Sequence, residues 1–105
     1  MRKLLVVLAV AALAVTAFAV VPAQSATRGV SVKDNVFSPK SLSVSKGTTV
    51  KWTWRGRAAH NVTFRGSAHS RTQTSGSYSH KFSNKGTFAY RCTIHAGMVG
   101  TIRVR

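Results

Sequence analysis

Apolar and polar residues alternate with a period of two along most of the chain after residue 27. The alternation is clearest at Val50, Trp52 and Trp54, which are separated by the polar residues Lys51 and Thr53. Successive side chains of a β-strand point to opposite faces, so this pattern predicts strands with one buried face. Similar short runs pair Val30 with Val32, Leu42 with Val44, Val62 with Phe64, Tyr78 with His80 and Phe82, Phe88 with Tyr90 and Cys92, and Ile102 with Val104.

Turn-forming residues separate these runs. They are Ser38-Pro39, Lys46-Gly47, Arg55-Gly56, Gly66-Ser67, Ser75-Gly76 and Lys85-Gly86. About six to eight short strands with regular turns predict an all-β fold, a small antiparallel Greek-key sandwich or barrel. We expect it to form one domain over residues 27–105, with Gly66 to Ser77 as a polar surface loop in which any strand is poorly defined.

The N-terminus has a different pattern. Met1-Arg2-Lys3 precedes a segment from Leu4 to Val21 that is apolar except for Thr16, and small residues follow it. These features are typical of a secretory signal peptide. We expect residues 1–26 to form a hydrophobic signal-peptide helix that is cleaved between Ala19 and Ala26. The alternative is an uncleaved membrane anchor, because the apolar segment just reaches spanning length.

The charge balance is strongly basic. The chain has 16 Lys and Arg residues but a single acid, Asp34, and a formal net charge of +15. Loss of Arg2 and Lys3 with the signal peptide would leave +13. One carboxylate excludes acid–base catalysis by a carboxylate pair, and the lone Cys92 excludes an internal disulfide. A domain this small usually needs a stabilising cross-link in addition to its core, and without a disulfide a bound metal is the best candidate.

Three metal-ligating residue types lie at intervals of three near the C-terminus: Cys92, His95 and Met98. If Phe88 and Tyr90 point into the core, the alternation turns Cys92 inward as well. A tight turn after this strand would then bring His95 and Met98 back around the Cys92 sulfur.

His60 is the best candidate for a fourth ligand, because it begins the strand of Val62 and Phe64 and could close the site from a neighbouring loop. Two imidazoles, one thiolate and one thioether are the donor set of a type 1 copper site. The sequence therefore predicts one type 1 copper ion per chain.

Each candidate also has an ordinary structural interpretation. A buried cysteine is often a small hydrophobic residue, and a methionine such as Met98 is often core filler. An unpaired thiol is a liability in an oxidising compartment, however, and metal ligation explains its presence. We interpret the other two histidines, His69 and His80, as structural or solvated residues.

These motifs together resemble the cupredoxin family, in particular the small plastocyanin-like and amicyanin-like blue copper proteins. The resemblance runs through Phe37-Ser38-Pro39, Gly47-Thr48-Thr49-Val50, His60-Asn61-Val62-Thr63-Phe64, the segment from Gly86 to Cys92, and the closing Gly100-Thr101-Ile102-Arg103-Val104. The spacing from Cys92 to Met98 looks like the amicyanin loop. Ile94 and Ala96 stand where that loop often has proline, which implies a looser loop.

The resemblance implies a role for each matching residue. His60, Cys92 and His95 would form a trigonal ligand set, with Met98 as a weak axial ligand. Asn61 would stabilise the ligand loop and tune the thiolate by hydrogen bonding.

The resemblance also implies a docking surface. The partly exposed edge of His95 would pass electrons to a docked partner, surrounded by Ala96, Gly97, Val99 and Phe37.

The predicted function is one-electron transport by an exported protein, periplasmic or extracellular, that is not an enzyme. Two alternatives remain open at this point: copper storage or delivery without electron transfer, and a cationic binding module on a cupredoxin scaffold. A net charge this large attracts anions over about 8–10 Å at physiological salt. We therefore expect a monomer with an acidic redox partner, or an anionic membrane or cell-wall surface, rather than nucleic acid.

Overall fold

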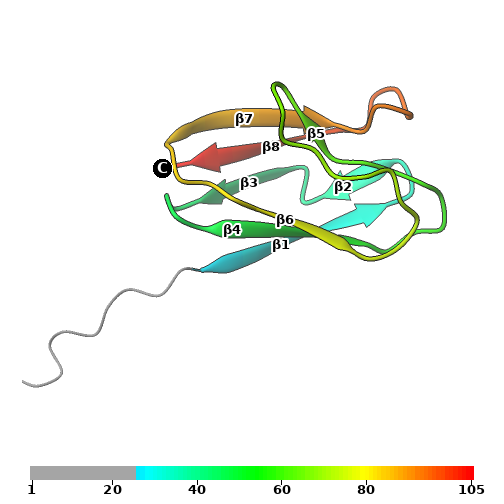
Figure 1. Cartoon of the computed structure of the whole chain (residues 1–105), viewed down its shortest axis with the longest axis horizontal. Coiled ribbons are helices and arrows are strands. Elements are labelled where there is room, and N and C mark those ends of the chain that lie inside the picture. Colours follow the sequence, from blue (N-terminus) through cyan, green and yellow to red (C-terminus); the bar gives the residue numbers. More distant parts are fainter. Residues whose placement is uncertain (1–25) are drawn as a thin grey trace, which may run out of the picture.

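The computed structural model describes residues 26–105 and contains eight strands in this range (Figure 1). The strands are β1 (Thr27–Lys33), β2 (Val36–Ser38), β3 (Ser41–Val44), β4 (Thr49–Trp54), β5 (Thr63–Phe64), β6 (Ser77–Lys81), β7 (Gly86–Arg91) and β8 (Val99–Val104). The predicted signal peptide lies outside the described residues, apart from Ala26. Among residues 26–105, no helix is long and apolar enough to cross a membrane.

The strands form two four-stranded sheets, in the orders β2-β1-β4-β6 and β3-β8-β7-β5. The predicted all-β sandwich is confirmed, but its antiparallel pairing is wrong for two pairs. β1 pairs with β4 in parallel and β3 pairs with β8 in parallel, whereas the other four pairs are antiparallel. β1 and β4 are parallel because the chain crosses to the second sheet after β2, forms β3 there, and then returns to the first sheet, where β4 runs beside β1 in the same direction.

The predicted inward positions form the core between the sheets. Trp52 is fully buried at its centre, where its ring meets those of Phe64 and Tyr90 edge-on at centroid distances of 5.8 and 5.3 Å. The other buried apolar residues are Val30, Val32, Phe37, Leu42, Val44, Val50, Trp54, Val62, Phe82, Cys92, Met98, Ile102 and Val104. The period of two therefore identified the buried face of most strands.

Tyr90 fixes the packing of the strand that leads into the cysteine. It faces Gly100 across the β7–β8 pair, and a Cβ on Gly100 would lie 2.8 Å from Tyr90 Cε1. The glycine is needed because the ring occupies that space. Burial raises the pKa of Tyr90 to about 12, and its hydroxyl has no hydrogen-bond partner among the described residues.

Three connections meet at one end of the sandwich, opposite the C-terminus (Figure 1). They are the β1–β2 turn, the β4–β5 connection and the β7–β8 connection. The segment between β5 and β6 contains no strand. It forms only two isolated β-bridges, from Gln73 to His60 and from His69 to Thr63. The fold thus delivers three segments distant in sequence to one place.

Candidate metal centre

Three donor side chains converge at this end of the sandwich. His60, from the β4–β5 connection, and Cys92 and His95, from the β7–β8 connection, place one ligand atom each within 4.8 Å of one another. Cys92 Sγ lies 4.0 Å from His60 Nδ1 and 3.6 Å from His95 Nδ1, and the two Nδ1 atoms are 3.1 Å apart. His60 and Cys92 are buried and His95 is half-buried.

The loop after β7 closes by backbone hydrogen bonds. The Cys92 amide donates to the Met98 carbonyl at 3.0 Å, and the Met98 amide donates to the His95 carbonyl at 3.2 Å. Gly97 has a φ of +81°, which non-glycine residues rarely adopt. The turn returns Met98 to the interior, where its side chain is 1% exposed.

His60 is held through its backbone by the surrounding loops. Its amide donates to the Gln73 carbonyl at 3.0 Å, and its carbonyl accepts the Gln73 amide at 3.0 Å. The Trp54 indole Nε1 also donates to this carbonyl, at 3.1 Å. These contacts tie the histidine to the end of β4.

Asp34 contacts the far side of the His60 ring, a position that sequence reasoning did not assign to the site. Its Oδ1 lies 3.0 Å from His60 Nε2. The pKa of this carboxyl is lowered to about 2 by hydrogen bonds to the Ala58 amide, the His60 ring and the Arg57 amide, in that order of effect. The available signal was its isolation, because it is the single acid of a very basic chain.

Asn61 links the His60 segment to the cysteine loop through a buried side chain. Its Oδ1 accepts from the Thr93 amide at 3.0 Å and from the Thr63 hydroxyl at 2.8 Å. Its Nδ2 donates to the Thr93 hydroxyl at 2.8 Å and to the Thr72 hydroxyl at 3.0 Å. Asn61 therefore connects three segments beside the donor cluster.

The donor set suits a soft metal ion such as copper rather than Mg²⁺ or Ca²⁺. A sulfur favours Cu(I), and imidazole nitrogens bind Cu(I) and Cu(II). No carboxylate of the described residues belongs to the cluster, as a Mg²⁺ or Ca²⁺ site would require.

Comparison with known proteins agrees with this chemistry. The family model of copper-binding proteins of the plastocyanin/azurin family matches residues 24–105. The chain belongs to this family. Its cofactor is copper.

Two plastocyanins are among its relatives. That of Prochlorothrix hollandica is 39% identical over 82 residues, covering 66% of this chain and 63% of the relative. The chain thus spans less than two thirds of that protein. Plastocyanin of Scenedesmus fuscus is 34% identical over 85 residues, covering 67% of this chain and 87% of the relative. An amicyanin variant in its Cu(I) form superposes with a TM-score of 0.70 at 30% identity, covering 80% of this chain and 86% of the other.

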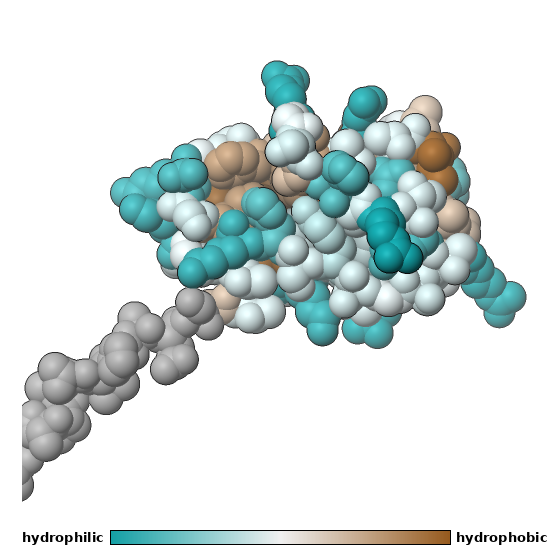
Figure 2. All heavy atoms as spheres, viewed as in Figure 1, coloured by the Kyte–Doolittle hydropathy of each residue, from teal (hydrophilic) through white to brown (hydrophobic). Residues whose placement is uncertain are grey.

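The tip of this cupredoxin, around His95, is apolar. Ala96, Gly97 and Val99, the residues expected to surround a docked partner, are exposed, and Ile94 is 52% exposed beside them. Figure 2 shows brown surface at the end where the β7–β8 connection lies. The sequence comparison with a loop proline at position 94 gives no signal for the apolar surface that Ile94 forms here.

Phe37 does not belong to this tip, which corrects the sequence-based expectation. It is 1% exposed and packs edge-on against Tyr90, with ring centroids 4.7 Å apart. Phe37 lies on the inward face of β2 and Tyr90 on the inward face of β7, so both belong to the core.

The two remaining histidines lie outside the donor cluster. The His69 ring is exposed, and its Nδ1 lies 3.0 Å from the Ser70 carbonyl. The His80 ring stacks on Phe64 at a centroid distance of 5.9 Å and contacts Phe82 edge-on at 4.7 Å. His69 is therefore solvated, and His80 packs against aromatic rings.

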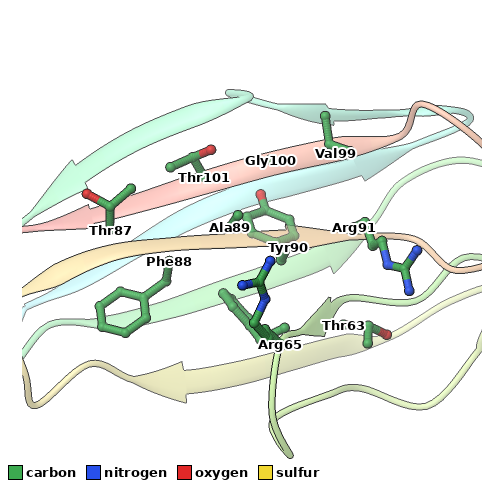
Figure 3. Close-up of a pocket in the computed structure, with 11 residues that line it drawn as sticks. Thr63, Arg65, Thr87, Phe88, Ala89, Tyr90, Arg91, Val99, Gly100 and Thr101 are labelled. Carbon is green, nitrogen blue, oxygen red and sulfur yellow. The ribbon is translucent and has the colours of Figure 1, made fainter.

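A groove of about 850 Å³ lies over β5, β7 and β8 (Figure 3). Phe88, Tyr90 and Gly100 are among its lining residues, together with the exposed basic residues Arg65 and Arg91. No residue of the donor cluster lines it, but the groove reaches the tip at Val99 and lies beside the cluster at Arg91, which directly precedes Cys92.

Proposed function

We propose that this cupredoxin is a one-electron carrier and not an enzyme, with one type 1 copper held by His60 Nδ1, Cys92 Sγ and His95 Nδ1 and weakly by Met98. The observation that carries the proposal is the convergence of two imidazole nitrogens and one cysteine sulfur within 4.8 Å. When bound, copper supplies the one-electron couple.

The protein residues divide the remaining tasks among themselves. Buried His60 and Cys92 exclude water from one side, and the sandwich holds them on separate loops that need not move. The half-buried His95 lies among the exposed Ile94, Ala96 and Val99, so a partner that covers this tip would come close to the imidazole edge. Electrons would leave and enter by this edge.

Copper titration tests the proposal directly. Purified protein given one equivalent of Cu(II) should turn intensely blue through charge transfer from the Cys92 thiolate. The colour should be lost in Cys92→Ser and in His95→Ala but retained in the control His69→Ala, which changes a histidine outside the cluster. A colourless Cu(II) complex, or colour that persists in Cys92→Ser, would exclude a type 1 site. A blue protein that exchanges no electrons but surrenders Cu(I) to a competing metal-free protein would indicate delivery instead.

We further propose an anionic redox partner, which approaches along the positive field of the chain. Residues 26–105 contain 14 of the 16 basic residues and the one acid. The single carboxylate–base pair among these residues joins Asp34 to His60, so the Lys and Arg side chains are not neutralised by a carboxylate. Arg91 ends β7 directly before Cys92, and Arg65 follows β5, the strand that pairs with β7. Both line the groove and would contribute to this field close to the metal centre.

Salt dependence tests the charge proposal with a small anionic oxidant, hexacyanoferrate(III). Its rate with the reduced protein should fall as salt rises, because ions screen the attraction. Arg91→Gln should lower the low-salt rate more than Lys46→Gln, a matched substitution at the opposite end of the sandwich. A salt-independent rate would contradict attraction by charge.

We also propose that the protein is exported, as a monomer, to the periplasm or the cell exterior. The basic, apolar and small-residue segments at the N-terminus support export. N-terminal sequencing of protein purified from its source should find a start between residues 20 and 27, and size-exclusion chromatography should give the monomer mass. A start at Met1 in a membrane fraction would instead indicate an uncleaved anchor.

A further inference from the structure

We propose that Asp34 is a positioning residue of the copper site: its carboxylate sets the orientation and tautomer of His60. This inference rests on the proposed function, since it assigns His60 Nδ1 to copper. It adds a residue outside the four candidate ligands and from a different part of the chain, the turn between β1 and β2.

The hydrogen bond to His60 defines which ring nitrogen carries the proton. An ionised carboxylate can accept hydrogen bonds but cannot donate them. Because Asp34 Oδ1 lies 3.0 Å from His60 Nε2, this nitrogen must be the donor. When Nε2 holds the ring proton of a neutral imidazole, Nδ1 keeps its lone pair. That lone pair faces His95 Nδ1 at 3.1 Å, from which it can accept a hydrogen bond, and Cys92 Sγ at 4.0 Å.

The carboxylate is itself fixed by backbone groups. The Arg57 amide donates to Oδ1 at 3.0 Å and to Oδ2 at 3.1 Å, and the Ala58 amide donates to Oδ1 at 2.9 Å. The Asp34 backbone lies in the two-residue turn between β1 and β2, which Asn35 completes at a φ of 68°. Asp34 is thus held between a turn and a loop, although its side chain is 44% exposed.

Gly56 makes room for this contact. A Cβ at position 56 would lie 2.7 Å from Asp34 Cγ and 2.8 Å from the Asp34 backbone nitrogen, closer than nonbonded atoms approach. The loop can therefore close over Asp34 only with glycine at this position. A side chain at 56 would separate the carboxylate from Ala58 and from His60.

The negative charge has a consequence for the metal. A carboxylate that accepts a hydrogen bond from a ligating imidazole fixes the ring and increases its donor strength, and loss of such a partner costs about 10–100-fold in metal affinity. A stronger, more negative donor set favours Cu(II) over Cu(I). The single acid of the chain therefore lowers the reduction potential, against the effect of the many basic residues.

The first test is made on the metal-free protein, so it does not depend on copper binding. In ¹⁵N-labelled protein at neutral pH, the imidazole nitrogen shifts should show His60 protonated at Nε2. In Asp34→Ala the two tautomers should mix, while Arg57→Ala, which retains the backbone amide, should keep the wild-type tautomer. A wild-type His60 protonated at Nδ1 would overturn the proposal, even if Asp34→Ala failed to fold.

The second test uses Cu(II) and Cu(I) competition titrations. Asp34→Asn and Gly56→Ala should each weaken Cu(II) binding about 10–100-fold. Cu(I) binding should weaken less, and each tenfold difference between the two raises the potential by about 59 mV. Ser45→Lys is the charge control, since it also adds one positive charge but lies at the opposite end of the sandwich, and it should leave Cu(II) affinity within about twofold. Equal effects of Asp34→Asn and Ser45→Lys would overturn the positioning role. A wild type without blue Cu(II) would instead contradict the proposed function and leave the tautomer result standing.

Discussion

Removal of the Asn61 side chain should loosen the loop that carries Cys92 and His95. In Asn61→Ala, four hydrogen bonds are lost, two to Thr93 and one each to Thr63 and Thr72. A protein hydrogen bond contributes about 0.5–1.5 kcal/mol net, so four would sum to about 2–6 kcal/mol. Thr93 and Thr72 are exposed and can turn their hydroxyls to water. We therefore expect a loss near the lower end, about 2–3 kcal/mol.

The assay is urea unfolding of the metal-free protein, followed by transfer of Cu(II) from the loaded protein to a chelator. Thr72→Val is the control, because it removes one of the four bonds at an exposed position and should cost about 0.5 kcal/mol or less. In Asn61→Ala the transfer of Cu(II) should also be faster, since the Thr93 amide is no longer held. A loss below about 1 kcal/mol, or equal losses in the two variants, would refute the assignment of Asn61 as the link between the loops.

Three further predictions concern packing, ionisation and metal loading. Gly100→Ala should cost about 1–3 kcal/mol in thermal unfolding, because its Cβ overpacks against the ring of Tyr90, and the cost should shrink in a Tyr90→Leu background; equal costs would contradict the contact. Tyr90→Phe removes a buried hydroxyl without a partner, so stability at pH 7 should be unchanged or higher. Above pH 10 the wild type should lose stability relative to Tyr90→Phe. The unfolded state releases the Tyr90 proton near pH 10, whereas the native state holds it until its pKa of about 12. Parallel pH profiles of the two proteins would show that burial does not shift this pKa. Free Cu(II) at about 100 times its dissociation constant should stabilise the fold by about 2.7 kcal/mol in calorimetry, an increase that Cys92→Ser should lose.

Much of the fold followed from local patterns in the sequence. The alternation at Val50, Trp52 and Trp54 identified the buried face of β4, because a strand presents every second residue to the same side. The spacing of Cys92, His95 and Met98 could also be read from the sequence, because all three lie in the single connection between β7 and β8. The parallel pairing of β1 with β4 could not be predicted in this way, because alternation does not reveal which strand lies alongside.

The sequence by itself thus determined the strands, their inward faces and a set of residues able to bind copper. The tertiary structure alone decided which distant residues meet: Asp34 reaches His60 across 26 residues of chain, and Asn61 reaches Thr93 across 32. It also decided that Phe37 is buried and that Ile94 is exposed at the tip. The physical reason is that periodicity reports how each segment divides between core and solvent. The contacts of a site depend on how loops from different strands come together, and this is settled only when the two sheets pack.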